Sequence, residues 1–387
     1  MAQKKNVIIV HSIKGGCGKT TIALGLAQYL GQVGKETESK KVCYIDLDLI
    51  GVGTSYLATE DGQKKINDGY SMSDFVLLNP FDNPDFFETL FDKAPVELFH
   101  NYFVEPDPDG KRYFRAIFSS SKKEVMDKAV RSTSDLFFAE DIKSKLKVLL
   151  EKLFTPSSNN EEIDTVILDT SPGIQGLTTI LLELARELSG DNHDGYNQKS
   201  KMNKDWQFIK IILATNNISH LQGLKDHFKK EKDFNTIIII NQIPLGFDFK
   251  SVPEVSDDLG IAEIKKTAVG DDRLEKFKKC LVLDHSIIDE KLLEAYKRYF
   301  LTRDKNFFPS FFAVNDLSAE DSAKIGNNVI VIPDHLSLRQ NAASFGEGEK
   351  FFSPDYFGKL LEMVNDGHLK NVGEKISETI NDGKKHE

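Results

Sequence analysis

The feature that most constrains the fold is a glycine-rich loop near the N-terminus, placed between an apolar run and a helical pattern. Residues 7–10 form a short β-branched run, and residues 14–21 read Lys-Gly-Gly-Cys-Gly-Lys-Thr-Thr. Residues 20–30 then carry apolar side chains at helical spacing. This order predicts a strand, a tight loop and a helix. Such a loop turns several backbone N–H groups inward at a helix N-terminus, which favours an anion such as phosphate.

The loop nearly matches the phosphate-loop pattern G-x-x-x-x-G-K-[ST], with Ile13 in the place of the first glycine. In that pattern Lys19 is expected to reach the β- and γ-phosphates, and the Thr20 hydroxyl is expected to bind Mg²⁺. The alternative is a glycine-rich turn that happens to end in Lys-Thr. The strand, glycines, Lys-Thr pair and helix occur in the required order, which favours the phosphate loop.

Further short, β-branched and almost entirely apolar runs follow along the chain, typical of strands covered by helices on both faces. They lie at residues 42–45, 166–168, 208–213, 237–240 and 329–332. Residues 176–188 carry a leucine-rich stripe at helical spacing between two of them. We therefore expect an α/β fold with a mostly parallel, doubly wound sheet flanked by helices.

Two stretches depart from this alternation and are interpreted as mainly helical insertions, at approximately residues 73–154 and 246–324. Residues 351–387 are expected to form a C-terminal helical tail. Because the informative motifs are spread over most of the 387 residues, we expect a single P-loop domain over residues 1–387 rather than several separate domains.

Composition narrows the class of protein. Hydrophobic residues make up 40% and charged residues 28%, a globular balance that excludes disordered, collagen-like and disulfide-scaffold proteins. No apolar run approaches the roughly 18 residues of a membrane span, and we expect no secretory signal. The three cysteines are too few for a disulfide framework, which favours a cytoplasmic location. A net charge of −10 argues against a wholly basic nucleic-acid binder.

Acidic residues stand where two of the expected strands end. Asp46 and Asp48 follow residues 42–45, and Asp169 follows residues 166–168. Ligands of open α/β sheets bind beyond the carboxyl ends of the strands, so these side chains are expected on the phosphate-loop side. A metal ion and an attacking water would both need carboxylates there. The alternative for each aspartate alone is a helix cap or a turn former.

The sequence Lys-Gly-Gly-x-Gly-Lys-Thr resembles the deviant Walker A motif of the ParA/MinD family of P-loop ATPases, which belongs to the SIMIBI class. The resemblance implies that Lys14 reaches across a dimer interface to the nucleotide of the other subunit. It implies that Asp48 orients the attacking water with Asp46 in support, and that Asp169, in Asp169-Thr-Ser-Pro-Gly, contacts the Mg²⁺ shell. Lys14, Lys19 and Asp48 would thus be the catalytic residues.

The resemblance continues toward the C-terminus. Asn241 follows the run at 237–240 and would hydrogen-bond adenine, and Pro333 and Asp334 would lie along the base. ATP and Mg²⁺ are the cofactors that it implies. The nucleotide-binding set is Lys14, Gly15, Gly16, Cys17, Gly18, Lys19, Thr20, Thr21, Asn241, Pro333 and Asp334, and the metal set is Thr20, Asp46 and Asp169.

The function that these motifs favour is an ATPase that forms an ATP-dependent homodimer and controls the positioning or partitioning of a protein partner or cargo. The acidic charge disfavours nonspecific DNA binding, although a local basic patch would permit it. Residues 356–364 are amphipathic but are not followed by the basic, aromatic face of a surface-binding helix, which argues against membrane attachment. Two alternatives remain open: an ATP-dependent ligase or kinase on the same fold, acting on a small acceptor, and a scaffold that binds nucleotide without hydrolysis.

Overall fold

The computed structural model describes only part of the chain. The described residues are 5–33, 41–49, 64, 66, 71–77, 114–120, 122–134, 136–155, 163–173, 176–189, 206–215, 218–231, 236–243, 328–333 and 372–376. The expected insertion at 246–324, the residue Asp334 and most of the expected tail at 351–387 lie outside them. Within the tail, residues 372–376 are helical.

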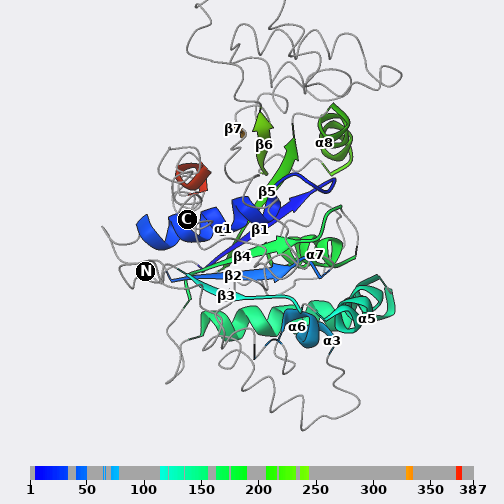
Figure 1. The fold of residues 1–387 in the computed structure, drawn as a ribbon. Helices are drawn as coiled ribbons and strands as arrows, with labels where there is room; N and C mark the ends of the chain where they lie inside the picture. Colours follow the sequence, from blue (N-terminus) through cyan, green and yellow to red (C-terminus); the bar gives the residue numbers. More distant parts are fainter. Residues whose placement is uncertain are drawn as a thin grey trace, which may run out of the picture. The chain divides into compact units, whose positions relative to one another are not determined.

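Seven strands of the described residues form a sheet, in the hydrogen-bonded order β3-β2-β4-β1-β5-β6-β7 (Figure 1). Every strand pair with a described register is parallel, namely β1/β4, β2/β4, β2/β3 and β6/β7. The strands are β1 Lys5–Ser12, β2 Val42–Leu47, β3 Arg115–Ile117, β4 Thr165–Thr170, β5 Trp206–Thr215, β6 Ile237–Ile243 and β7 Val329–Pro333. The expected parallel α/β sheet is thereby confirmed.

Helices alternate with the strands along the chain. They are α1 Lys19–Val33, α3 Met72–Leu77, α5 Lys123–Ser134, α6 Leu136–Phe154, α7 Leu177–Ser189 and α8 Ile218–Glu231. Helix α7 shows why the sequence pattern succeeds, because its five stripe residues are all at most 8% exposed: Leu177, Ile180, Leu181, Leu184 and Leu188. None of the described helices is long and apolar enough to cross a membrane.

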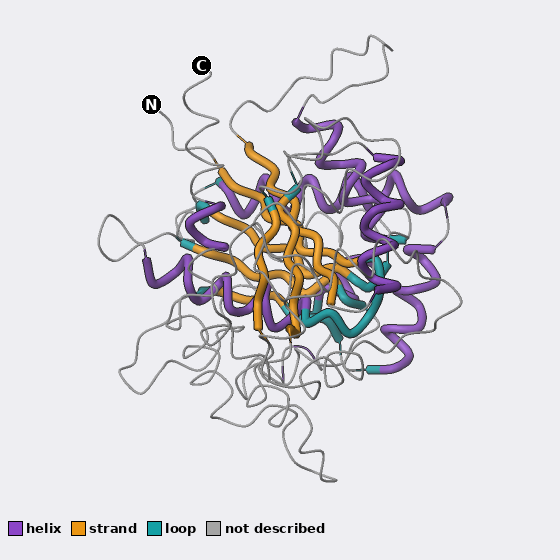
Figure 2. The backbone as a smooth tube through the Cα atoms, turned by 90° about the horizontal axis from the view of Figure 1, so that it is seen from above, coloured by secondary structure: helices purple, strands orange, loops and turns teal. Residues whose placement is uncertain are grey.

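The chain divides into two compact units. The first comprises Met1–Ile211 and Leu336–Glu387, and it contains strands β1 to β4 with helices α1, α3, α5, α6 and α7. Figure 2 shows the strands in orange with helices, in purple, beside them. The core of the first unit includes strand β1, where Val7, Ile8, Ile9 and Val10 are 0% exposed. The second unit, Ile212–His335, contains α8, β6 and β7.

Strand β3 was not expected from the sequence. It lies at the edge of the sheet and pairs with β2 through Cys43↔Arg115 and Ile45↔Ile117. The stretch 73–154, interpreted as an insertion, therefore contributes a strand as well as helical segments to the first unit. Phe118, directly after β3, is fully buried.

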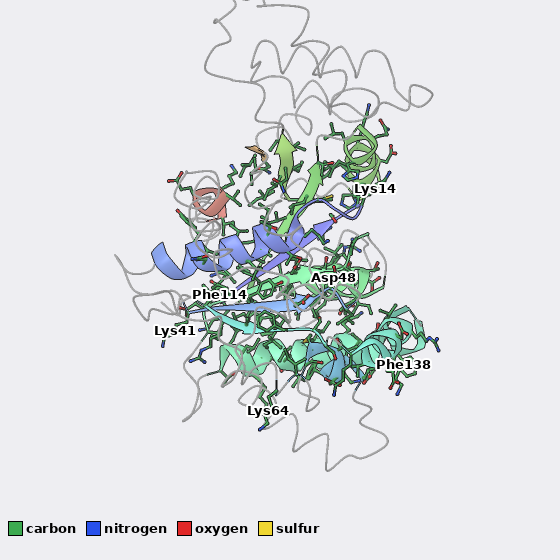
Figure 3. All side chains as sticks on the ribbon, viewed as in Figure 1. Lys14, Lys41, Asp48, Lys64, Phe114 and Phe138 are labelled. Carbon is green, nitrogen blue, oxygen red and sulfur yellow. The ribbon has the colours of Figure 1, made fainter. Side chains whose placement is uncertain are left out.

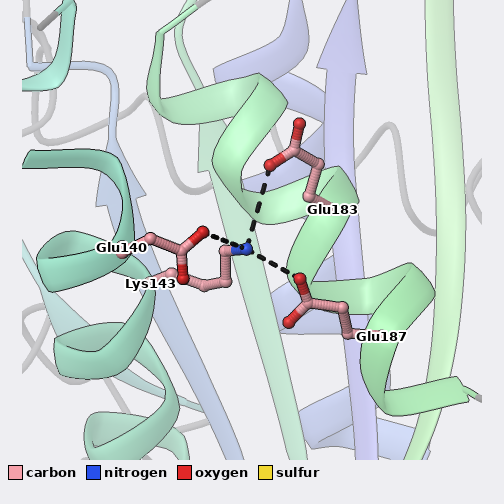
Figure 4. Close-up of polar contacts among 4 residues, drawn as sticks. All are labelled: Glu140, Lys143, Glu183 and Glu187. Carbon is pink, nitrogen blue, oxygen red and sulfur yellow. Dashed lines mark hydrogen bonds and ion pairs between the residues drawn. The ribbon is translucent and has the colours of Figure 1, made fainter. Parts of the chain in front are cut away.

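Helices α6 and α7 of the first unit are joined by an ion cluster around Lys143 (Figure 4). The ammonium lies 2.9 Å from Glu140 Oε1, 2.7 Å from Glu187 Oε1 and 3.9 Å from Glu183 Oε2. Burial of the amine lowers the pKa of Lys143, but the hydrogen bonds and charges of Glu187 and Glu140 outweigh it and raise the pKa. The cluster holds the two helices together without exposing a charged amine.

Candidate functional site

The loop between β1 and α1 has the backbone of a phosphate cradle. Gly16 and Gly18 adopt φ angles of +76° and +79°, in the left-handed region that side chains disfavour. A Cβ at Gly16 would meet no atom within 4 Å, so the space beside this residue is open. Helix α1 begins directly after the loop, where the Ile22 N–H donates to the Gly18 carbonyl over 3.0 Å. The first N–H groups of α1 therefore face the loop, as anion binding requires.

Side chains hold the loop at the carbonyl of Lys14. The Ser12 hydroxyl donates to this carbonyl over 2.8 Å, and the Cys17 thiol donates to it over 3.0 Å. The Gly173 N–H donates in turn to the Ser12 carbonyl over 2.9 Å, so the segment after β4 is tied to the loop. Lys14 itself is exposed, as are Gly15 and Gly16. The backbone of Lys14 is thus fixed while its ammonium group is directed to solvent.

The three predicted aspartates lie together at the carboxyl ends of β2 and β4. Asp46 and Asp169 are direct register partners in these strands, and both are buried, at 1% and 0% exposure. The backbone N–H of Asp48 donates to Asp46 Oδ1 over 2.9 Å. Asp48 is half-buried, and Figure 3 labels it at the same end of the strands as Lys14. Asp46 and Asp169 were expected just beyond the strands but belong to them, because the backbone pairing continues past the apolar residues.

Burial dominates the electrostatics of this cluster. Burial, the charge of Asp169 and then the charge of Asp48 raise the pKa of Asp46 well above its usual range. Burial also raises the pKa of Asp169, to about 6, although the Lys19 ammonium and the Thr20 hydroxyl act in the opposite direction. Lys19 is only 6% exposed, so its charge acts in a dry environment. Two acidic groups and one cation thus share a buried site beside the loop.

Two residues of this site were not expected from the sequence. The Tyr44 hydroxyl donates to Asp169 Oδ2 over 2.9 Å, and the Ser119 hydroxyl donates to the backbone carbonyl of Asp46 over 2.9 Å. Tyr44 could have been found from its spacing, because residues two apart on a strand share a face and Tyr44 precedes Asp46 by two. No local signal marks Ser119, since strand β3 before it was itself unexpected.

The residues present fit a hydrated Mg²⁺ ion. Asp169 Oδ1 is buried and has no hydrogen-bond partner among the described residues, so one carboxylate oxygen is left for a ligand. Thr20 offers a hydroxyl close by, and hard oxygen donors of this kind suit Mg²⁺, which keeps several waters and takes few protein ligands. Within the described part of the chain, no group of three or more His, Cys, Asp or Glu residues could hold a metal ion.

The predicted base-binding residues belong to the second unit. Asn241 is buried at 8% exposure in β6, and Pro333 ends β7 opposite Ile243.

Comparison with known proteins identifies a family match. Residues 8–380 match the family described as the CobQ/CobB/MinD/ParA nucleotide-binding domain. The chain belongs to this family. The ParA/MinD resemblance expected from the loop is thereby confirmed, and nucleotide binding is the property that the family description carries. No curated protein matches the chain at a significant level.

Solved structures were also matched, at low similarity. A proposed plasmid partition protein from Borrelia burgdorferi bound to AMPPNP is 19% identical over 62% of this chain and 77% of its own, with a TM-score of 0.38. The MinC:MinD complex of Aquifex aeolicus matches at 15% identity over 83% and 94%, with a TM-score of 0.32. The cell division ATPase MinD of Pyrococcus furiosus matches at 15% over 84% and 97%, also with a TM-score of 0.32. With TM-scores this low, the assignment depends on the family match and on the sheet and loop.

Proposed function

We propose that this member of the CobQ/CobB/MinD/ParA family is an ATPase of ParA/MinD type. It binds Mg-ATP, dimerises in the ATP-bound state and hydrolyses ATP to ADP and phosphate, and the cycle controls the positioning or partitioning of a protein partner. The observation that carries the proposal is the buried pair of Lys19 and Asp169 beside a loop with two left-handed glycines. The expected cytoplasmic location is part of the same proposal.

The residues of the loop and of α1 would hold the phosphates. The N–H groups of residues 15–21 supply donors at the N-terminus of α1, and the Lys19 ammonium supplies a desolvated positive charge. Thr20 and Asp169, supported by Asp46, would hold the Mg²⁺ ion. When bound, the ion neutralises charge on the phosphate oxygens. The adenine would be bound by Asn241, Pro333 and Asp334.

Lys14 and Asp48 would complete catalysis. Because the Lys14 carbonyl is fixed by Ser12 and Cys17 while its side chain is exposed, the ammonium can reach a nucleotide held by a second copy. A cation supplied in this way by an arginine finger is worth about 10³ to 10⁵ in rate. Asp48 is half-buried, and its backbone is fixed by Asp46, which suits a carboxylate that orients water.

Light scattering after size-exclusion chromatography tests the proposal. The wild type should be monomeric with Mg-ADP and dimeric with Mg-ATP, and Asp48→Ala should retain the dimer because ATP persists. Lys14→Ala should lose both the dimer and the turnover, whereas Lys128→Ala, which removes an exposed lysine of α5, should lose neither. A wild-type chain that stays monomeric with both nucleotides would contradict the dimerisation switch.

A phosphate-release assay separates the proposal from its alternatives. The proposed ATPase releases phosphate without any small acceptor. The rate of release per chain should rise with protein concentration, because the dimer is the active form. Turnover that begins only when a small acceptor is added would instead identify an ATP-dependent ligase or kinase. Binding of ATP without phosphate release under either condition would identify a nucleotide-binding scaffold.

A further inference from the structure

We infer that Tyr44 is a positioning residue for Mg²⁺: its hydroxyl holds one oxygen of Asp169 so that the other oxygen faces the metal. The inference rests on the proposed function, because it assigns Asp169 to the Mg²⁺ site. It goes beyond that proposal in giving a role to a tyrosine in the middle of a core strand, where an apolar side chain would serve packing equally well.

The register of the sheet brings the two groups together. Tyr44 on β2 lies opposite Ile167 on β4, and Asp46 lies opposite Asp169. Tyr44 is therefore the diagonal neighbour of Asp169 on the adjacent strand, and residues two apart on a strand project to the same face. An aromatic side chain can span a diagonal of this kind. The observed hydrogen bond, 2.9 Å from Tyr44 Oη to Asp169 Oδ2, uses this reach.

The complete burial of Tyr44 means that its hydroxyl needs a hydrogen-bond partner. Tyr44 is 0% exposed and is among the largest fully buried side chains, and its ring packs against Phe118 with centroids 6.3 Å apart. A hydroxyl in such a place costs free energy unless it is hydrogen-bonded, and a phenylalanine would avoid that cost. Here the hydroxyl donates to the carboxylate beside the phosphate loop.

The hydrogen bond divides the two oxygens of Asp169. Oδ2 accepts from Tyr44, whereas Oδ1 is buried with no hydrogen-bond partner among the described residues. A carboxylate with one oxygen held by the protein cannot rotate freely about its Cβ–Cγ bond, so the other oxygen is preoriented. Groups that orient a metal-binding carboxylate in this way typically change metal affinity by about 10- to 100-fold when they are removed.

The test is the Mg²⁺ dependence of nucleotide-induced stabilisation. The melting temperature of the chain is followed with saturating AMPPNP as Mg²⁺ is increased, with an EDTA sample as the zero point. Tyr44→Phe removes one oxygen atom and keeps the ring, and it should raise the Mg²⁺ concentration at half-maximal stabilisation by about tenfold. Tyr29→Phe removes a hydroxyl from α1 and should leave this concentration unchanged. A Tyr44→Phe midpoint within twofold of wild type would overturn the inference and leave the proposed function intact.

A double variant shows whether Tyr44 acts through Asp169. In an Asp169→Asn background, adding Tyr44→Phe should change the Mg²⁺ midpoint by less than twofold, because the carboxylate that Tyr44 positions is gone. An undiminished tenfold effect in that background would overturn the inference, since Tyr44 would then act by another route. Wild-type stabilisation by AMPPNP that is indifferent to Mg²⁺ would overturn both the inference and the Mg-ATP proposal.

Discussion

Replacing Asp169 by asparagine should stabilise the free chain at neutral pH, even though it should weaken the response to Mg²⁺. The reason is that the folded chain buries this carboxyl group completely. Burial raises its pKa from 3.8 to about 6 despite the neighbouring ammonium of Lys19. Asparagine keeps the size of the side chain and an oxygen that can accept from Tyr44, but it carries no charge to desolvate.

The size of this stabilisation follows from the pKa of Asp169 in the unfolded chain and in the folded chain. Between pH 4 and pH 6 the folded chain retains a proton that the unfolded chain has lost, so the free energy of unfolding falls as the pH rises. A tenfold change in a protonation equilibrium is worth about 1.4 kcal/mol, so the fall approaches about 3 kcal/mol above pH 6. The Asp169 charge also raises the pKa of Asp46, which adds to the effect in the same direction. Asp169→Asn removes both contributions.

Urea denaturation in EDTA, without nucleotide, measures this change in the free energy of unfolding directly. The free energy of unfolding of Asp169→Asn minus that of the wild type should increase by about 3 kcal/mol between pH 4 and pH 7.5. Asp226→Asn, which removes an exposed carboxyl group from α8, should show no such increase. A difference for Asp169→Asn that is constant with pH, or that decreases, would refute the argument that burial dominates this carboxyl group.

Three other substitutions, two of them paired with a second substitution for comparison, test the geometry through thermal unfolding. Gly16→Ala should lower the free energy of unfolding by about 1–2 kcal/mol, because the backbone of Gly16 is left-handed. Gly15→Ala should cost nothing, since its new Cβ would lie 3.8 Å from the nearest atoms. Equal effects of the two substitutions would contradict the loop conformation. Gly373→Ala should cost about 1–3 kcal/mol, because its Cβ would clash with the Tyr29 ring, and Tyr29→Ala should relieve that cost. Lys143→Met should cost about 1 kcal/mol or less, since its three carboxylate partners are 47–83% exposed, and a cost unchanged in 1 M salt would argue against ion pairing.

Most of the sheet could be predicted because its strands are buried on both faces. Six apolar runs each became a strand, but each run was shorter than its strand. In β4 the expected residues 166–168 became Thr165–Thr170, because the polar Asp169 continues the backbone pairing. Apolar patterning reports burial of side chains, whereas strand length is set by hydrogen bonds between neighbouring strands.

Strand β3 could not be predicted for the same reason. Its three residues, Arg115–Ile117, form no β-branched or alternating run. They are a strand because their backbone pairs with the edge of β2 that β4 leaves open. Ala116 and Ile117 are fully buried in the strand, but a run of three residues is too short to show a period in the sequence. Its neighbour Ser119, which contacts Asp46, was therefore missed as well.

The site separates into a local part and a part that depends on register. The phosphate loop is contiguous, so glycines, Lys19 and the start of α1 could be recognised together in the sequence. Tyr44 and Asp169 are 125 residues apart and meet only because β2 pairs with β4 in one particular register. The spacing within β2 puts Tyr44 on the same face as Asp46, but only the register with β4 brings Asp169 to that face.

Calorimetric titration with Mg-ATP tests the central claim, that the loop after β1 binds the nucleotide. The wild type should bind one Mg-ATP per chain. Lys19→Ala should lower the affinity by at least about 100-fold, because it removes a desolvated positive charge from the phosphates. Lys128→Ala, at an exposed position of α5, should bind as the wild type does. Binding by Lys19→Ala with wild-type affinity would contradict the claim and place the nucleotide elsewhere on the chain.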